Sequence, residues 1–211
     1  MYTQLIKINP NHPSVSTLKK TAAIIKKGGL VILPTDTVYG LVCDATNPAA
    51  VRKLFKIKKR PLSQPLSIAL SDLSHIYKYV ENLPELAEKI AKKFLPGPLT
   101  LVIKKSKLIP NVVTAGRADI GIRIPDSKIV LMLLKLIRRP IVIPSANIHN
   151  RTSPTTAQLT LKDLNGKVDL ILDGGKTKHG IESTVVSLTN NEIKILREGA
   201  ISSKEIFSCV K

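Results

Sequence analysis

The sequence predicts an α/β fold, a twisted mixed sheet flanked by helices, and three observations support this. Short runs rich in Val, Ile and Leu alternate with stretches of helical periodicity along the 211 residues. Some runs are joined by helices and others by turns such as Asn190-Asn191, which implies both parallel and antiparallel pairing. The chain shows no internal repeat, low-complexity linker or break in composition. We therefore expect one domain over residues 1–211.

Capping residues indicate where two helices begin and end. Ser14 can cap the first, which carries an apolar face and ends at a glycine pair. Asn47 and Pro48 supply a cap and a favourable first position for the second. Pro61 disfavours helical geometry at Arg60, so the second helix must end there.

The remaining elements follow from apolar patterning. The segment 127–137 is apolar nearly all round, which favours a central buried helix. The other expected helices span 84–94 and 202–210. The expected strands are 5–8, 30–33, 66–70, 99–103, 119–124, 141–143, 168–172, 184–188 and 192–196.

Composition restricts the classes of partner and compartment. Lys and Arg total 33 against 15 acidic residues, a net charge of +18, which favours polyanionic partners. Aromatic residues are only 3%, which disfavours a platform for stacked bases. Cys43 and Cys209 are isolated, as is typical of a reducing compartment. Because residues 1–10 do not resemble a signal peptide and no apolar run approaches ~20 residues, we expect a cytoplasmic protein without a membrane span.

Two kinds of site are disfavoured. The segment 173–177 resembles the end of a phosphate-binding P-loop, but Leu170 stands where that motif requires its first glycine. The four histidines have no metal-ligand spacing with one another or with the cysteines. We expect no metal-binding residues in this chain.

A basic run at 52–60 ends in Lys58-x-Arg60. Held by the helix end and by Pro61, Lys58 and Arg60 would form a fixed clamp for phosphate, with a bidentate fork from Arg and a point charge from Lys. A merely solvated helix end remains the alternative for this motif alone. The residues expected on the solvated side are Arg52, Lys53, Lys56 and Lys59.

Seven motifs occur in a fixed order and together are far more specific than any one. They are Pro-Thr-Asp-Thr-Val-Tyr-Gly-Leu from residue 34, Lys-x-Arg-Pro from 58, Pro-Gly-Pro-Leu-Thr from 96, Gly-Ile-Arg-Ile-Pro-Asp from 121, Pro-Ser-Ala-Asn from 144, Glu-Ser-Thr-Val-Val from 182 and Leu-Arg-Glu-Gly-Ala-Ile from 196. With them the chain resembles the YrdC family of threonylcarbamoyl-adenylate synthases over about residues 15–205. The resemblance implies a YrdC-like fold with a concave basic cleft, in the short single-domain form.

The resemblance also implies an activity. Family members combine L-threonine, bicarbonate or CO2, and ATP into threonylcarbamoyl-AMP and pyrophosphate, with Mg2+ on the phosphates. The product serves N6-threonylcarbamoyladenosine formation in tRNA, so partner proteins that accept it, and tRNA contact, are implied. Carried over to this chain, the catalytic residues would be Lys58 and Arg60. The ATP-binding residues would be Lys58, Arg60, Ser145, Asn147, Ser153 and Arg197. Threonine would be bound by Thr35, Arg123 and Ser183, with Arg123 on its carboxylate.

Two departures from the family and one alternative function remain. Ala69 stands where many relatives have a histidine that contacts threonine, and Ser187 stands where Asp is usual. The alternative is a non-enzymatic protein of the same fold that binds double-stranded RNA and acts on tRNA or rRNA, which the charge favours. The shortage of aromatic residues and the intact Ser-x-Asn and Glu-Ser-Thr motifs favour the enzyme.

Overall fold

The computed structural model describes residues 2–189 and 192–210, so the expected turn at Asn190-Asn191 lies outside the described residues. The strands form one sheet in the order β1-β8-β2-β3-β7-β4-β6-β5-β9-β10. Their bounds are β1 Gln4–Lys7, β2 Val31–Pro34, β3 Tyr39–Asp44, β4 Ser67–Ala69, β5 Leu99–Lys104, β6 Asp119–Arg123, β7 Ile141–Val142, β8 Leu170–Asp173, β9 Thr184–Ser187 and β10 Lys194–Arg197.

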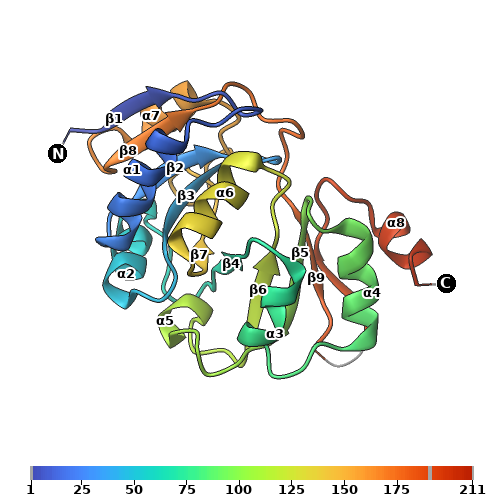
Figure 1. Ribbon diagram of the computed structural model, residues 1–211. Coiled ribbons are helices and arrows are strands. Elements are labelled where there is room, and N and C mark those ends of the chain that lie inside the picture. The colour runs from blue at the N-terminus through green and yellow to red at the C-terminus, as the bar shows by residue number, and fades with distance from the viewer. Residues whose placement is uncertain (1, 190–191, 211) are drawn as a thin grey trace.

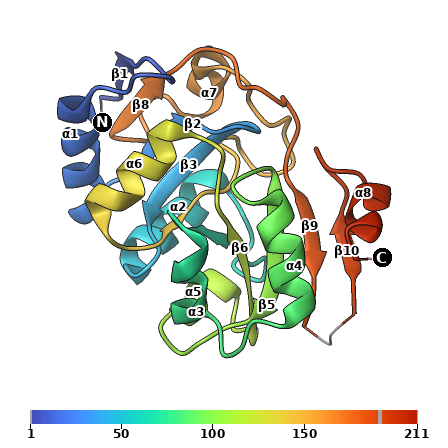
Figure 2. The same ribbon diagram turned by 45° about the vertical axis from the view of Figure 1, so that its right-hand side comes forward.

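The pairing within this sheet is mixed, as predicted. β1 with β8, β2 with β8, β4 with β6 and β5 with β9 are parallel. The other pairs are antiparallel, including β2 with β3 and β5 with β6. Figures 1 and 2 show β1 and β8 at one end of the sheet and β9 toward the other, and Figure 2 shows β10 at that end with α8 beside it.

The helices are α1 Val15–Lys26, α2 Pro48–Lys58, α3 Ile76–Tyr79, α4 Glu85–Phe94, α5 Asn111–Thr114, α6 Lys128–Ile137, α7 Ala157–Leu164 and α8 Ser203–Ser208, with a 3-10 turn, η1, at Leu73–His75. The predicted caps are confirmed. Ser14 accepts from the Thr17 amide, and Asn47 accepts from the first amides of α2. Lys59 takes a left-handed conformation with φ 53° and ends α2 before Arg60.

Successive side chains of a strand point to opposite faces of the sheet, so the core forms two layers, one on each face. On one face, Val31, Leu33 and Val42 pack beneath α1 and α6, which lie side by side (Figure 1). On the other face, Ile32 and Leu41 belong to a larger cluster that includes residues of α2, α4 and α7. Because α1 and α6 cover only part of their face, the strands from β3 to β9 leave room for a cavity there.

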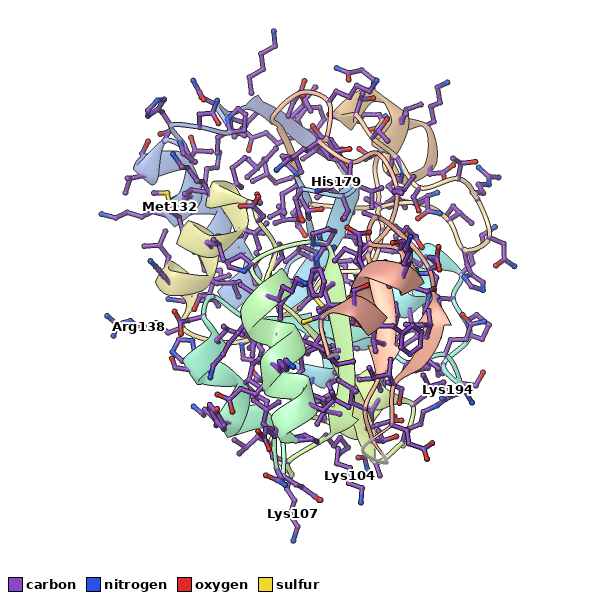
Figure 3. The ribbon with its side chains drawn as sticks, turned by 90° about the vertical axis from the view of Figure 1, so that its right-hand side faces the viewer. Lys104, Lys107, Met132, Arg138, His179 and Lys194 are labelled. Carbon is purple, nitrogen blue, oxygen red and sulfur yellow. The ribbon has the colours of Figure 1, made fainter. Side chains whose placement is uncertain are left out.

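The helix expected at 127–137 is present as α6, but the expectation that it is central and buried on all sides was wrong. α6 lies on the outside of the sheet, with Lys128 and Lys135 exposed and Leu131 and Met132 only partly buried. Figure 3 shows Met132 at the periphery of the molecule. α6 is apolar on most sides because it packs against the sheet and also against α1. Within residues 2–189 and 192–210, no helix has the length and apolarity that a membrane crossing requires.

One strand and three α-helices were missing from the expectation. No strand was expected between residues 34 and 65, whereas Tyr39–Asp44 forms β3, a fully buried strand between β2 and β7. Three helices, α3, α5 and α7, were also not expected. The predicted strands agree with the structure to within about two residues at their ends.

Candidate active site

A cavity of about 340 Å3 occupies the part of the sheet that α1 and α6 leave open. Its floor comes from residues on that face of neighbouring strands, among them Ser67 of β4, Thr100 of β5 and Gly121 of β6. A Cβ at Gly121 would collide with the Ser67 hydroxyl, so glycine at this position keeps the floor open.

Of the nine residues predicted to bind ATP or threonine, six line this one cavity. They are Thr35, Arg60, Arg123, Ser145, Ser183 and Arg197. The other three, Lys58, Asn147 and Ser153, lie behind its wall, and each is linked by hydrogen bonds to a residue that lines it or to another of the three. The fold therefore brings together residues up to 162 positions apart, from Thr35 to Arg197.

Arg123 is held rigidly at the buried end of the cavity. Its Nε donates to Gly97 O (3.1 Å), its Nη1 to Thr37 Oγ1 (2.9 Å) and its Nη2 to Asp36 Oδ1 (2.5 Å). Burial lowers the pKa of Arg123, and the Asp36 carboxylate opposes that effect. Since each terminal nitrogen makes one such bond among the described residues, one N–H on each is left for a ligand, a suitable fork for a carboxylate.

The Thr35 hydroxyl organises the turn that carries Asp36 and Thr37. It donates to Val38 O (2.7 Å) and accepts from the amides of Thr37 (3.1 Å) and Val38 (3.3 Å). Asp36 has a second carboxylate oxygen that is buried without a donor among the described residues. Among the described residues, Arg123 is the one cation paired with Asp36, and this ion pair helps to fix the position of the guanidinium.

Arg197 and Glu182 form the opposite wall. Arg197 pairs with Glu182 and also donates to the backbone oxygen of Ser183 (2.9 Å). The Ser183 hydroxyl lies 2.9 Å from Thr100 Oγ1 and 3.2 Å from an Arg197 nitrogen. On the outer side, Ser153 donates to Glu182 (2.7 Å), so Ser153 orients the carboxylate that holds Arg197.

Lys58 is buried behind Ser145, with 2% of its surface exposed. Its Nζ donates to the backbone oxygens of Ser145 (2.5 Å) and Asn147 (2.8 Å). Burial, and next the charge of Arg60, lower the pKa of Lys58 to about 8. In this structure Lys58 thus fixes the loop 145–147, and its direct contact with phosphate stays a prediction.

Arg60 points into the cavity from the end of α2. Its Nε and Nη2 donate to the backbone oxygens of Gln64 (3.3 Å) and Pro65 (2.9 Å), which hold the guanidinium against the loop after Pro61. Burial lowers the pKa of Arg60, and Glu182 opposes that effect. Three of its five N–H groups are not used by these two bonds, so Arg60 can still donate to a bound anion.

Sequence reasoning missed several lining residues. Thr37, Thr100 and Glu182 belong to the motifs, which could have indicated them, but no role was assigned to them. Arg117 also lines the cavity, from a turn after α5 that lies in no motif. Its position depends on tertiary structure, and no local pattern indicates it.

The chemistry of the cavity suits anionic ligands. Four arginines line it, and one of the two lining carboxylates is already paired with Arg197. No cluster of three His, Cys, Asp or Glu side chains occurs anywhere in the described ranges. Mg2+ commonly binds through substrate phosphates, water and one or two carboxylates. The described side chains therefore give Mg2+ no ligand cage of their own.

A family model named Sua5_yciO_yrdC and described as telomere recombination matches residues 23–199. The chain belongs to this family. A threonylcarbamoyl-AMP synthase of Pyrococcus abyssi is 42% identical over 189 residues, 90% of this chain and 56% of the relative. The Bacillus subtilis threonylcarbamoyl-AMP synthase is 38% identical over 202 residues, 95% of this chain and 57% of the relative. This chain therefore spans little more than half the length of these two relatives.

A member of the Sua5/YciO/YrdC family has been solved with an amino acid bound. The crystal structure of P. abyssi Sua5 complexed with L-threonine superposes with a TM-score of 0.95 at 39% identity, covering 99% of this chain and 61% of that one. This agreement confirms the predicted family fold.

The structure gives a physical reason for alanine at position 69, where many relatives have histidine. Ala69 pairs with Arg123 between β4 and β6, but it is fully buried in the core cluster that includes Val130 and Leu133 of α6. A side chain as large as histidine would compete with α6 for that space. The second departure, Ser187 on β9, is also buried, and its hydroxyl lies 3.2 Å from Thr189 Oγ1.

Proposed function

We propose that this chain is a threonylcarbamoyl-AMP synthase, forming threonylcarbamoyl-AMP and pyrophosphate from L-threonine, bicarbonate or CO2, and ATP. The observation that carries the proposal is the convergence of six predicted ligand-binding residues on one arginine-lined cavity. The names of the relatives and the threonine complex of P. abyssi Sua5 support it. They favour this activity over the non-enzymatic RNA-binding alternative.

Threonine would bind at the buried end of the cavity. The two free N–H groups of Arg123 would hold its carboxylate, and Ser183, which lines the same cavity, would help to orient the amino acid. Arg123 is suited to this because three protein contacts already fix its guanidinium. Little conformational entropy would then be lost when the amino acid binds.

ATP would bind toward Arg60, Ser145 and Arg197. The amine of threonine and bicarbonate form a carbamate with loss of water, and a carbamate oxygen attacks the α-phosphorus of ATP. The bond from that phosphorus to the bridging oxygen of the β-phosphate breaks, and pyrophosphate leaves with the electron pair. Arg60 and Arg197 would stabilise the charge on the departing phosphates, and catalysis would come from positioning and electrostatics.

Loop 145–147 and its lysine would support this geometry. Lys58 holds the loop through two carbonyl oxygens, so Ser145 lines the cavity from a fixed backbone. Asn147 donates to Arg151 O (2.5 Å), which anchors the following turn. Mg2+ would supply further charge neutralisation to the phosphates when bound.

The test is pyrophosphate release in the presence of ATP, threonine and bicarbonate. We expect release that depends on threonine and stops when threonine is omitted. Release at the same rate without threonine would refute the proposal. The product would pass to the proteins that modify tRNA in the cytoplasm, and assays for transfer into tRNA would follow once release is established.

A further inference from the structure

Glu182 places a negative charge in a cavity that otherwise suits anions. It lines the cavity together with Arg60 and Arg197, the two residues that would stabilise the departing phosphates. A carboxylate beside a bound phosphate chain is repelled by it, so anion binding alone gives no reason for an acidic residue at this position. The charge of Glu182 therefore needs an explanation of its own.

The carboxylate of Glu182 is held at both of its oxygens. Ser153 donates to Oε1 at 2.7 Å, and Nη1 of Arg197 donates to Oε2. The backbone is fixed as well, because the Glu182 carbonyl accepts from the Ala200 amide (3.0 Å) and a Cβ at Gly199 would collide with the same oxygen. The carboxylate is thus kept beside Arg197 instead of turning freely into solvent.

The contacts of Arg197 leave it little capacity for a ligand. Its Nε and Nη2 donate to the Ser183 carbonyl at 3.1 and 2.9 Å, and Nη2 also lies 3.2 Å from the Ser183 hydroxyl. Since a guanidinium has five N–H groups, these contacts and the one with Glu182 leave one N–H on Nη1. A phosphate that takes both N–H groups of Nη1 must displace Glu182, so the two compete for the same nitrogen.

The charge of Glu182 also acts on the Lys58-x-Arg60 motif. Burial lowers the pKa of Lys58 and of Arg60, and the Glu182 carboxylate opposes that effect in both. Glu182 is therefore within electrostatic range of three cations at the phosphate end of the cavity. It serves them as an internal counter-ion, and a phosphate that binds there does so against this charge.

Stability of the fold gives little reason for this ion pair. The side chains of Arg197 and Glu182 are 45% and 35% exposed, and ion pairs so exposed contribute little to stability. The reaction gives a better reason. Cleavage adds negative charge to the departing pyrophosphate, so the arginines that stabilise this charge also tend to retain the product. A carboxylate that competes for one of these arginines limits that retention.

We propose that Glu182 is a positioning residue that competes with phosphate oxygens for Arg197 and so allows pyrophosphate to leave the site. The identity of the leaving group rests on the proposed function, while the competition itself rests on the contacts of Glu182. Ser153 would keep the carboxylate in place for this role.

The test measures the binding of inorganic pyrophosphate by isothermal titration calorimetry in the unmodified chain and three variants. Glu182→Gln keeps the size of the side chain and can still accept from Ser153, but it removes the charge. Glu182→Asp keeps the charge. Glu198→Gln is the matched control, because Glu198 directly follows Arg197 but is exposed, bonded to Ser203 and outside the cavity lining. Thermal unfolding establishes that each variant is folded.

We expect Glu182→Gln to bind pyrophosphate at least about tenfold more tightly, the effect of one hydrogen bond to a charged group. Glu198→Gln should bind it as the unmodified chain does, and Glu182→Asp should bind it more weakly than Glu182→Gln. Weaker or unchanged binding in Glu182→Gln, as expected of a residue that merely supports the wall, would overturn the proposal. Equal tightening in Glu198→Gln would also overturn it, because net charge alone would then explain the effect.

Steady-state kinetics provide a second readout. In Glu182→Gln, both kcat for threonine-dependent pyrophosphate release and the KM for ATP should fall, and added pyrophosphate should inhibit at lower concentration. A rise in the KM for ATP would contradict the proposal. If the unmodified chain releases no pyrophosphate but Glu182→Gln still binds it more tightly, the proposed function fails and the competition at Arg197 stands.

Discussion

Replacement of Arg60 by alanine should weaken ATP binding while leaving the chain folded. Two N–H groups of Arg60 are used by the backbone oxygens of Gln64 and Pro65, and three remain for a ligand. A hydrogen bond to a charged group contributes about 1.5–3 kcal/mol. With 1.36 kcal/mol for each factor of ten, loss of one such bond predicts a fall in kcat/KM for ATP of about 10- to 150-fold.

The assay follows pyrophosphate release at saturating threonine and bicarbonate while the ATP concentration varies. Lys56→Ala is the matched control, because Lys56 lies on the same helix but is exposed and does not line the candidate active-site cavity. It should leave kcat/KM unchanged. Thermal unfolding of both variants separates a loss of binding from a loss of structure.

Two results would refute the reasoning on Arg60. The first is equal kcat/KM for ATP in Arg60→Ala and Lys56→Ala, which would show that Arg60 is merely a solvated helix end. The second is an increase in the KM for threonine at unchanged ATP affinity, which would place Arg60 in the wrong part of the cavity.

Three further predictions concern other residues of the site. Arg123→Lys retains a charge beside Asp36 but loses the fork, so the KM for threonine should rise at least about tenfold while that for ATP changes little; equal changes in both would contradict this. The pKa of Lys58 is about 8, below its ordinary 10.5, so the folded chain releases this proton more readily than the unfolded chain. The free energy of unfolding should therefore rise by about 3 kcal/mol as the pH increases from about 8 to about 10.5. Denaturant titrations across this pH range should show that Lys58→Met removes this rise. If the free energy of unfolding depends on pH in the same way in Lys58→Met and in the unmodified chain, the low pKa of Lys58 is contradicted. Ala69→His should cost about 1–3 kcal/mol of stability by overpacking the core under α6, and tighter threonine binding instead would contradict the packing argument.

Local signals in the sequence were enough to predict much of the fold. Ser14 and Asn47 cap helices through contacts within three residues, so their roles are readable from the sequence. β3 was missed because it begins inside a polar, glycine-containing motif and owes its strand conformation to β2 and β7 on either side. The position of α6 was misjudged because the hydropathy of a helix does not show whether it is covered by other elements on all sides or packs only against the sheet and one neighbouring helix.

The candidate site was predictable as a set of motifs but not as a geometry. Six residues of these motifs line one cavity, because the motifs lie at the ends of strands of one sheet or at the end of a helix that packs on it. The position of Lys58 could not be predicted, because its partners Ser145 and Asn147 lie 87 and 89 residues away.

The most direct test of the central claim is mass spectrometry of the nucleotide product formed from ATP, threonine and 13C-labelled bicarbonate. The proposed function predicts a threonylcarbamoyl-AMP that carries the label in its carbamoyl carbon, with pyrophosphate released in equal amount. An unlabelled threonyl adenylate, or AMP and pyrophosphate formed without threonine, would contradict the account.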